Sequence, residues 1–410
     1  MNKLKKFYTK HYYAISFFSF ILVYNIVFTC ILGEWEFHNE ALSFHLVDFS
    51  MGFCSRFLVG AIYNSIFDNT SVLSVILYES ILLITFLLII SFYLEKLVLS
   101  IEKEHRKTIL FILIFFVTGT STLPMYVYML GSFDSYWFYL SIIFIALLSR
   151  KQLYIFIVPV FITTIIIHYA SIVAFIPFYL FILLYKISIT EEKKERFLLW
   201  AIVVVSTVSA ILFAGYFIVF DNKNLTYSME DFIAILKSRG IVSEPIYYLT
   251  SFYDYDYFGM LDKESFANIT SPFLYALKFL EYRIKVNFEL IPFEQGFVPF
   301  LLNLPVVVFI LLYLRDRNKE NSTNKIRIIT TFCMCAMFFC TIILSVFLST
   351  DIVRFISHAY MLLFASFLYI IYNEKGAYLE YIDAYIMKFP KSIIALYIIF
   401  YTTMIFKPYT

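Results

Sequence analysis

The chain has 410 residues, of which 61% are hydrophobic, 21% aromatic and only 15% charged. A soluble domain averages about 45–50% apolar and about 25% charged residues, so this composition excludes an ordinary soluble domain. Several apolar runs reach about 17 residues or more, the length of a bilayer span. The net charge of +2 does not indicate a partner by itself, and its distribution along the chain is more informative. We therefore expect an all-α, polytopic membrane protein.

The first predicted span, about residues 13–32, follows four lysines, which places the N-terminus in the cytoplasm. These are Lys3, Lys5, Lys6 and Lys10. The flanks lack an A-x-A cleavage pattern, so we expect a retained helix. Residues 33–70 then form the first extracytoplasmic loop, in which Arg56 is the single basic residue among the acids Glu34, Glu36, Glu40, Asp48 and Asp68.

Further apolar runs alternate with short loops rich in Lys and Arg. Four runs lie at about 71–94, 197–220, 328–348 and 392–406, and a pair lies within 152–185. Two more begin near residues 108 and 296, and two end near residues 149 and 372. The basic loops fall on one side when the runs are threaded through a membrane. The sequence thus predicts one integral domain over residues 1–410, with about eleven spans, the N-terminus inside and the C-terminus outside.

Two segments break this alternation. Residues 221–295 are polar, have more acids than bases and are too long for a simple connection, so we expect one large extracytoplasmic loop. Residues 373–391 read as an amphipathic helix on the inner membrane surface.

The predicted topology brings unusual polar residues from separate outer turns to one face. They are Asp48, Arg56, Asp134, His168, Asp351, Arg354 and His358. Ionisable side chains at membrane depth are costly and mark functional sites by default. We therefore expect a site at the extracytoplasmic face.

Asp48, Gly52, Arg56 and Gly60 are spaced by four, which on a helix places them on one face. The glycines would allow another backbone or a ligand to approach closely. The alternative is a surface amphipathic helix whose charges only cap and solvate it. Glu79, in the second span, is a candidate partner for Arg56.

The other polar residues also have two interpretations. Asp351, Arg354 and His358 stand at i, i+3 and i+7, which suits either a substrate site or an ion pair within one helix. Asp134 suits either a catalytic role or a helix N-cap. His168 interrupts a long apolar run, and either packs there or donates to a phosphate or hydroxyl.

The large loop contains YYLTSFYDYDYFGMLDKE at residues 247–264, with Tyr255 in its middle. Alternating rings and carboxylates suit sugar binding, and the alternative is an aromatic belt at the headgroup level. Asp254, Asp256 and Gly259 resemble the start of a calcium loop, but Phe258 and Ser265 stand where ligands are needed. We expect no resident metal or other cofactor, with a divalent cation left open.

A single acid in the first outer loop, an amphipathic segment behind it and about eleven spans resemble the GT-C superfamily of membrane glycosyltransferases. The resemblance implies a polyprenyl-phosphate sugar donor and a carboxylate base in that loop, the position matched by Asp48. Arg56 and Asp134 complete the catalytic set that we expect. The chain departs from the family pattern because it has no D-x-D or acidic doublet.

The size, the Phe/Tyr/Ile/Lys-rich makeup and the large outer loop are also similar to bacterial O-antigen or capsule polymerases (Wzy-type). That resemblance implies transfer of a glycan between polyprenyl-diphosphate carriers in the bacterial inner membrane. Arg56, Arg239, Arg283 and Arg354 are then candidates to hold the diphosphate, because the arginine fork suits phosphate oxygens. His168, Tyr255, Asp351 and His358 join the expected substrate-binding set.

The expected partners are a polyprenyl-linked sugar, a glycan acceptor, membrane lipids and other polysaccharide-assembly proteins, with no nucleic acid. The rival from another class is a secondary transporter or lipid-linked oligosaccharide flippase. Such proteins usually place charges near the bilayer midplane and often contain repeated halves. Here the charges lie at the outer rim and no repeat is visible, which favours the enzyme.

Overall fold

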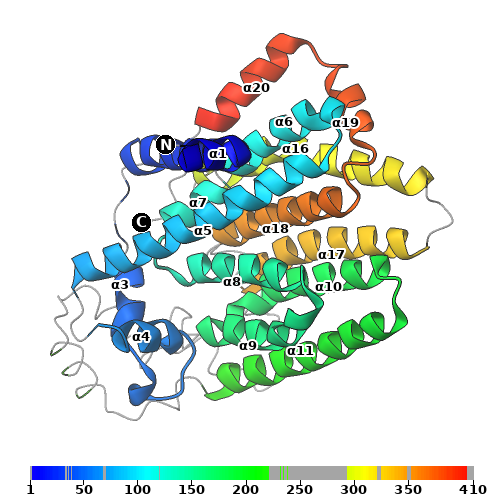
Figure 1. Cartoon of the computed structure of the whole chain (residues 1–410). Coiled ribbons are helices and arrows are strands. Elements are labelled where there is room, and N and C mark those ends of the chain that lie inside the picture. Colours follow the sequence, from blue (N-terminus) through cyan, green and yellow to red (C-terminus); the bar gives the residue numbers. More distant parts are fainter. Residues whose placement is uncertain are drawn as a thin grey trace.

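The computed structural model describes residues 2–32, 35, 37, 39–67, 71–119, 121–220, 231, 234, 238, 293–320, 325–348 and 352–403. Over these residues the regular secondary structure is helical, and the long helices pack side by side (Figure 1). The prediction of an all-α bundle is therefore confirmed.

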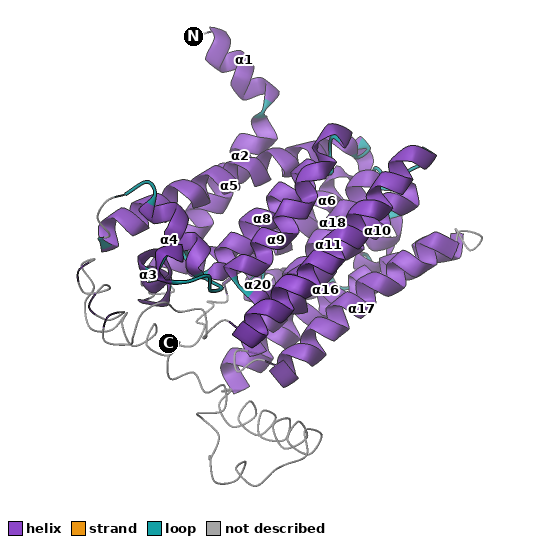
Figure 2. Ribbon diagram, turned by 90° about the horizontal axis from the view of Figure 1, so that it is seen from below, coloured by secondary structure: helices purple, strands orange, loops and turns teal. Residues whose placement is uncertain are grey.

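The first half of the bundle contains the first loop and the central helices. Its elements are α1 (Asn2–Lys10), α2 (Tyr12–Tyr24), the π-helix η1 (Asn25–Ile31), α3 (Asn39–Leu46), η2 (Phe49–Met51), α4 (Phe57–Asn64), α5 (Val72–Ser100), η3 (Lys103–His105), α6 (Arg106–Thr118), α7 (Leu123–Tyr128), α8 (Phe133–Leu147), η4 (Lys151–Phe156), α9 (Ile157–Ile167), η5 (Tyr169–Val173), α10 (Phe175–Ile189) and α11 (Lys193–Phe220). Figure 2 shows α1 projecting away from the bundle, while the other long helices lie together.

The second half adds further helices, which pack against those of the first half. They are α16 (Phe293–Glu320), α17 (Lys325–Leu348), α18 (Ile352–Asn373), α19 (Leu379–Ile386) and α20 (Lys391–Thr403). The axes of α19 and α20 meet at 106°. Within the predicted interfacial segment 373–391, α19 buries Leu379 and Ile382 and exposes Glu380, while its place on the inner membrane surface stays a prediction.

Within the part of the chain that the structure describes, five helical segments are long and apolar enough to cross a membrane, or six if the bent pair α19 and α20 counts as one span. The five are Tyr12–Ile31, Val72–Ser100, Lys103–Tyr128, Lys193–Phe217 and Arg354–Asn373. Other apolar helices are shorter, such as Phe133–Leu147 with 15 residues. At 1.5 Å per residue, such a helix covers about 22 Å of a hydrocarbon core about 30 Å thick.

The long helices expose apolar side chains outward and bury polar ones. On α5 the residues Leu73, Leu77 and Ile81 are exposed, whereas Glu79 is completely buried. On α11 the residues Val204, Val208 and Ile211 are at least half exposed. Contiguous exposed apolar surface of this extent is rare on soluble monomers. These faces suit lipid, which supports a membrane protein.

The basic loops gather at one end of the bundle. Lys151 Nζ lies 2.7 Å from Glu192 Oε2, and Tyr154 donates to Glu195. At the same end, the buried Arg317 donates to Glu374, which lies at the end of α18. In Figure 1 the connection between α10 and α11 and the C-terminal end of α16 lie on the right, while α3 and α4 lie on the left.

The predicted helix face through Asp48, Gly52, Arg56 and Gly60 is wrong. The Asp48 side chain accepts from Ser50 N at 2.8 Å and begins only the short η2 turn. Gly52 has a φ of 138° and Arg56 a left-handed φ of 73°, so α4 starts only at Phe57. The Arg56 N–H donates to the Ile166 carbonyl at 3.0 Å, which fixes this turn against α9.

The predicted close approach at a glycine is confirmed for Gly60. A Cβ built there would lie 1.8 Å from the Val47 carbonyl oxygen and 2.6 Å from that of Phe44. Helices α3 and α4 therefore pack backbone to backbone. The predicted break near His168 is also confirmed, because α9 ends at Ile167 and η5 begins at Tyr169.

Candidate functional site

The N-terminus of α8 carries a fully buried carboxylate, Asp134. Its Oδ1 lies 2.6 Å from His358 Nε2 and 3.6 Å from Arg354 Nε. The Ser132 hydroxyl donates to its Oδ2 at 3.1 Å. Ser132 is the residue that precedes the helix, so Asp134 lies within the first turn and is not the N-cap. The helix dipole favours a negative charge at this position.

His358, on α18, links Asp134 to Tyr126. Its Nδ1 lies 2.9 Å from the Tyr126 hydroxyl, and all three side chains are fully buried. The network assigns the ring proton to Nε2, which donates to the carboxylate while the tyrosine hydroxyl donates to Nδ1. The aromatic rings of Trp137 and Phe175 pack around the imidazole. Because these hydrogen bonds are shielded from solvent, they hold Asp134, His358 and Tyr126 in fixed positions.

Arg354 lies one helical turn before His358, in the first turn of α18. Its guanidinium carbon lies 4.6 Å from the centre of the Phe133 ring, a cation–π contact, and its side chain is 13% exposed. Arg354 and His358 both reach Asp134 on α8. The alternative of an ion pair within one helix involves Asp351, which lies outside the described residues.

His168 brings Arg56 into the same region. Arg56 Nη2 lies 2.7 Å from His168 Nε2, and the Ala170 N–H lies 3.1 Å from His168 Nδ1. Burial, and after it the positive charges of Arg56 and Arg354, hold the pKa of His168 well below its usual value of 6.5. Burial and these two cations therefore keep the imidazole neutral at physiological pH.

We call Arg56, Asp134, His168, Arg354 and His358 the arginine corner. The Phe133 ring lies between its members, 4.7 Å from the His168 ring. Arg354 lies beside the Asp134 carboxylate and Arg56 beside His168, so the corner brings two guanidinium groups together. Arg56 is only partly buried, and it lies at the accessible edge. Such an arrangement can hold an anion with several oxygen atoms, such as a phosphate.

Asp48 lies on the loop that carries Arg56. Its carboxylate accepts from Ser50 N and from the Asn64 amide at 3.3 Å, and it is partly exposed. Of the ten residues predicted for the site, the structure brings five into one corner and places Asp48 on the adjoining turn. The other four, Arg239, Tyr255, Arg283 and Asp351, lie outside the described residues.

A second buried ionisable pair joins α3 to α5. His45 Nε2 lies 2.8 Å from Glu79 Oε1, and both side chains are completely buried. Tyr136 on α8 also donates to Glu79 Oε1, and His45 Nδ1 lies 2.6 Å from the Ala41 carbonyl oxygen. The prediction that Glu79 is the partner of Arg56 is therefore wrong. In the sequence, Glu79 is an acid inside an apolar span, and such a side chain requires a nearby hydrogen-bond donor.

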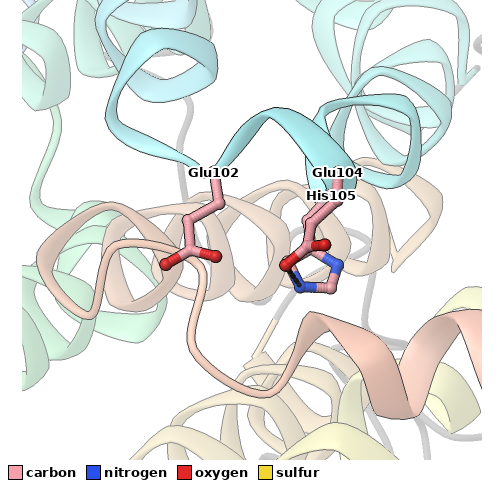
Figure 3. A group of neighbouring side chains, drawn as sticks. All are labelled: Glu102, Glu104 and His105. Atoms are coloured by element: carbon pink, nitrogen blue, oxygen red, sulfur yellow. Dashed lines mark ion pairs between the residues drawn. The ribbon is translucent and has the colours of Figure 1, made fainter.

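One group of potential metal ligands lies at the opposite end of the bundle, on the turn between α5 and α6. Figure 3 shows Glu102, Glu104 and His105 projecting from this turn, and their ligand atoms lie within 4.8 Å of one another. Both glutamates are exposed, and His105 Nδ1 also lies 3.7 Å from Asp383 Oδ2. Surface charge pairing accounts for this group, and it carries no metal assignment.

No protein-family model, no curated protein and no solved structure matches the chain. The functional argument therefore rests on the arginine corner and its surroundings.

Proposed function

We propose that the chain is a membrane glycosyltransferase of cell-surface polysaccharide synthesis that uses a polyprenyl-(di)phosphate-linked sugar. The observation that carries the proposal is the convergence of Arg56 and Arg354 around His168, with Asp134 as the carboxylate among them. Two neighbouring guanidinium groups suit a phosphate or diphosphate, because the arginine fork matches its oxygens. The enzyme is either GT-C-like or a Wzy-type O-antigen or capsule polymerase.

The proposed topology places the corner at the extracytoplasmic face of a bacterial inner membrane. The Lys- and Arg-rich segments at 150–151, 186–197 and 315–319 gather at the end of the bundle opposite α3 and α4 (Figure 1). Basic loops stay in the cytoplasm during insertion. This rule places the N-terminus inside the cell, and with the proposed number of about eleven spans the C-terminus lies outside.

In the proposed reaction an acceptor hydroxyl attacks the anomeric carbon of the donor sugar. Asp48 takes the hydroxyl proton, the bond from the sugar to the carrier phosphate breaks, and the electron pair leaves with the phosphate. Arg56 and Arg354 stabilise the charge that develops on this leaving group. Asp134 is buried behind them, so we assign it a positioning role through Arg354 and His358. Arg239, Tyr255, Arg283 and Asp351 remain proposed contacts for the donor and acceptor.

The direct test is turnover of a lipid-linked sugar by the reconstituted full chain without any ion gradient. Asp48→Asn, Arg56→Ala and Arg354→Ala should each lower turnover at least about 100-fold, the usual effect of losing one stabiliser of transition-state charge. Arg150→Ala, an exposed arginine at the opposite end, should retain activity. Wild-type turnover in the Asp48 and Arg56 variants, at equal protein levels, would exclude the proposed mechanism.

The second candidate is a secondary transporter or lipid-linked oligosaccharide flippase. The completely buried pair of His45 and Glu79 favours it, because ionisable pairs inside helical bundles serve as proton relays in transporters. The same reconstitution separates the two. An enzyme forms glycan product without a gradient, whereas a transporter moves its substrate across the bilayer and leaves the sugar–phosphate bond intact.

A further inference from the structure

A cavity of about 240 Å³ lies between α6, α16 and α18, beneath the elbow formed by α19 and α20. Its walls include Phe115, Phe309, Phe364 and Ile382. In Figure 1, α19 and α20 run beside α6 at the upper margin of the bundle. The cavity is separate from the arginine corner, because none of its lining residues belongs to that corner.

The chemistry of the lining excludes a polar ligand. Its residues are Phe, Ile, Val, Pro and one tyrosine, and the accessible surface inside is apolar. Cavities of about 150 Å³ lined by such side chains stay dry and take up hydrocarbon. This cavity is larger, so an empty state would forfeit dispersion contacts along its walls. A hydrocarbon chain is the occupant that restores them.

The mouth of the cavity opens toward the lipid-facing surface. Two lining residues, Phe389 and Ile393, are 51% and 54% exposed, so they belong to both the wall and the outer surface. On the same outer side of α20, Leu396 and Ile399 are also exposed. A chain lying in the cavity can therefore continue into the surrounding hydrocarbon without crossing a polar barrier.

Positive charge flanks this mouth. Lys388 and Lys391 are exposed on either side of Phe389 and Pro390, and Lys388 Nζ lies 4.9 Å from the Tyr385 ring centre. The nearby Arg315 donates to Asp316 at 3.0 Å, so its charge is already balanced. Basic residues beside apolar pockets between membrane helices attract anionic headgroups.

We propose that this cavity is a binding site for an anionic phospholipid, with one acyl chain inside and the headgroup on Lys388 and Lys391. The site lies at the end of the bundle that carries the basic loops, away from the arginine corner. The proposal does not depend on the glycosyltransferase activity.

Native mass spectrometry of the purified full chain with phosphatidylglycerol or phosphatidylcholine tests the headgroup. The wild type should retain phosphatidylglycerol at least tenfold better than phosphatidylcholine. Lys388→Gln combined with Lys391→Gln should abolish this preference. The matched pair Lys193→Gln and Lys194→Gln removes two exposed charges from α11, which does not line the cavity, and should preserve it. Equal retention of the two lipids by the wild type would overturn the proposal.

A phosphatidylglycerol with a photoactivatable group on its acyl chain tests the cavity itself. In the wild type, crosslinks should concentrate on α16 and α20, and Val306→Trp should reduce them at least tenfold by filling the space. Val308→Trp is the control, because Val308 is 46% exposed on the outer face of α16 and does not line the cavity. Wild-type crosslinks confined to the outer faces of α5 and α11 would overturn the proposal without any variant.

Discussion

At the scale of single residues, the most constrained group is the imidazole of His168. It lies 7% exposed between the side chain of Arg56 and the ring of Phe133. Positive charges on two sides make a protonated ring costly, because like charges repel strongly where water is scarce. His168 therefore stays a neutral acceptor and fixes the direction in which Arg56 points.

The folded protein should lose stability in mild acid because of His168. Its pKa is lowered in the folded state, so below pH 6.5 the unfolded chain binds a proton that the folded chain does not. Stability attributable to this group is complete above pH 6.5 and falls as the pH decreases, by up to about 1.4 kcal/mol per pH unit. Unfolding midpoints of the wild type and His168→Gln at pH 7.5 and pH 5.5 measure it. An identical pH dependence in the two proteins would contradict the assignment.

At the scale of the elements, the contact between α3 and α4 sets the shape of the first loop. Gly60 lets the two helices approach backbone to backbone, and the turn between them carries Asp48 and Arg56. The pair of His45 and Glu79 ties α3 to α5, and the Arg56 N–H ties the turn to α9. The loop is thus fixed from three sides before any substrate binds.

Gly60→Ala should separate α3 from α4. A methyl group there meets the Val47 carbonyl oxygen at 1.8 Å, so the backbone must move, with an expected loss of about 1–3 kcal/mol in unfolding free energy. Gly215→Ala is the matched control, because nothing lies within 4 Å of its Cβ and it is exposed within α11. That variant should be neutral or stabilised by up to about 1 kcal/mol. Comparable losses in both variants, by denaturant unfolding in detergent, would argue against the close approach.

The conformation of this loop could not be predicted from the sequence. The spacing of Asp48, Gly52, Arg56 and Gly60 fits a helix, and each local preference is compatible with one. The left-handed φ of Arg56 is stabilised by a bond to Ile166, which lies 110 residues further along the chain. The pairing of His45 with Glu79 likewise depends on how α3 folds back onto α5. Tertiary contacts determine both the turn at Arg56 and the pairing of His45 with Glu79, and the periodicity of the sequence does not reveal such contacts.

At the scale of the whole molecule, the distribution of Lys and Arg predicted which loops lie together. The loops at 150–151 and 186–197 meet through Lys151 and Glu192. The convergence of Asp134, His168, Arg354 and His358 also followed from alternating helices, although Asp134 and His358 are 224 residues apart. The pairing of side chains within the arginine corner could not be predicted in this way. The alternation of helices across the membrane determines at which face a residue lies, but not how each helix is rotated about its axis.

The orientation in the membrane predicts opposite labelling of two engineered cysteines. The five native cysteines are free and are first replaced. Ser65→Cys beyond α4 should react with an impermeant maleimide in intact cells, and Lys194→Cys at the start of α11 should react only after permeabilisation. Both positions are exposed, so access depends on the side of the membrane. The reverse pattern would invert the topology and place the arginine corner inside the cell.

The buried pair of His45 and Glu79 also has a consequence for biosynthesis. An acid inside an apolar span makes insertion of that span into the membrane costly. His45 leaves the ribosome before Glu79, so one partner is already available when α5 enters the membrane. Tyr136 arrives later with α8 and completes the shell around the carboxylate. The order of the chain therefore supplies the partners of Glu79 one after the other, first His45 and then Tyr136.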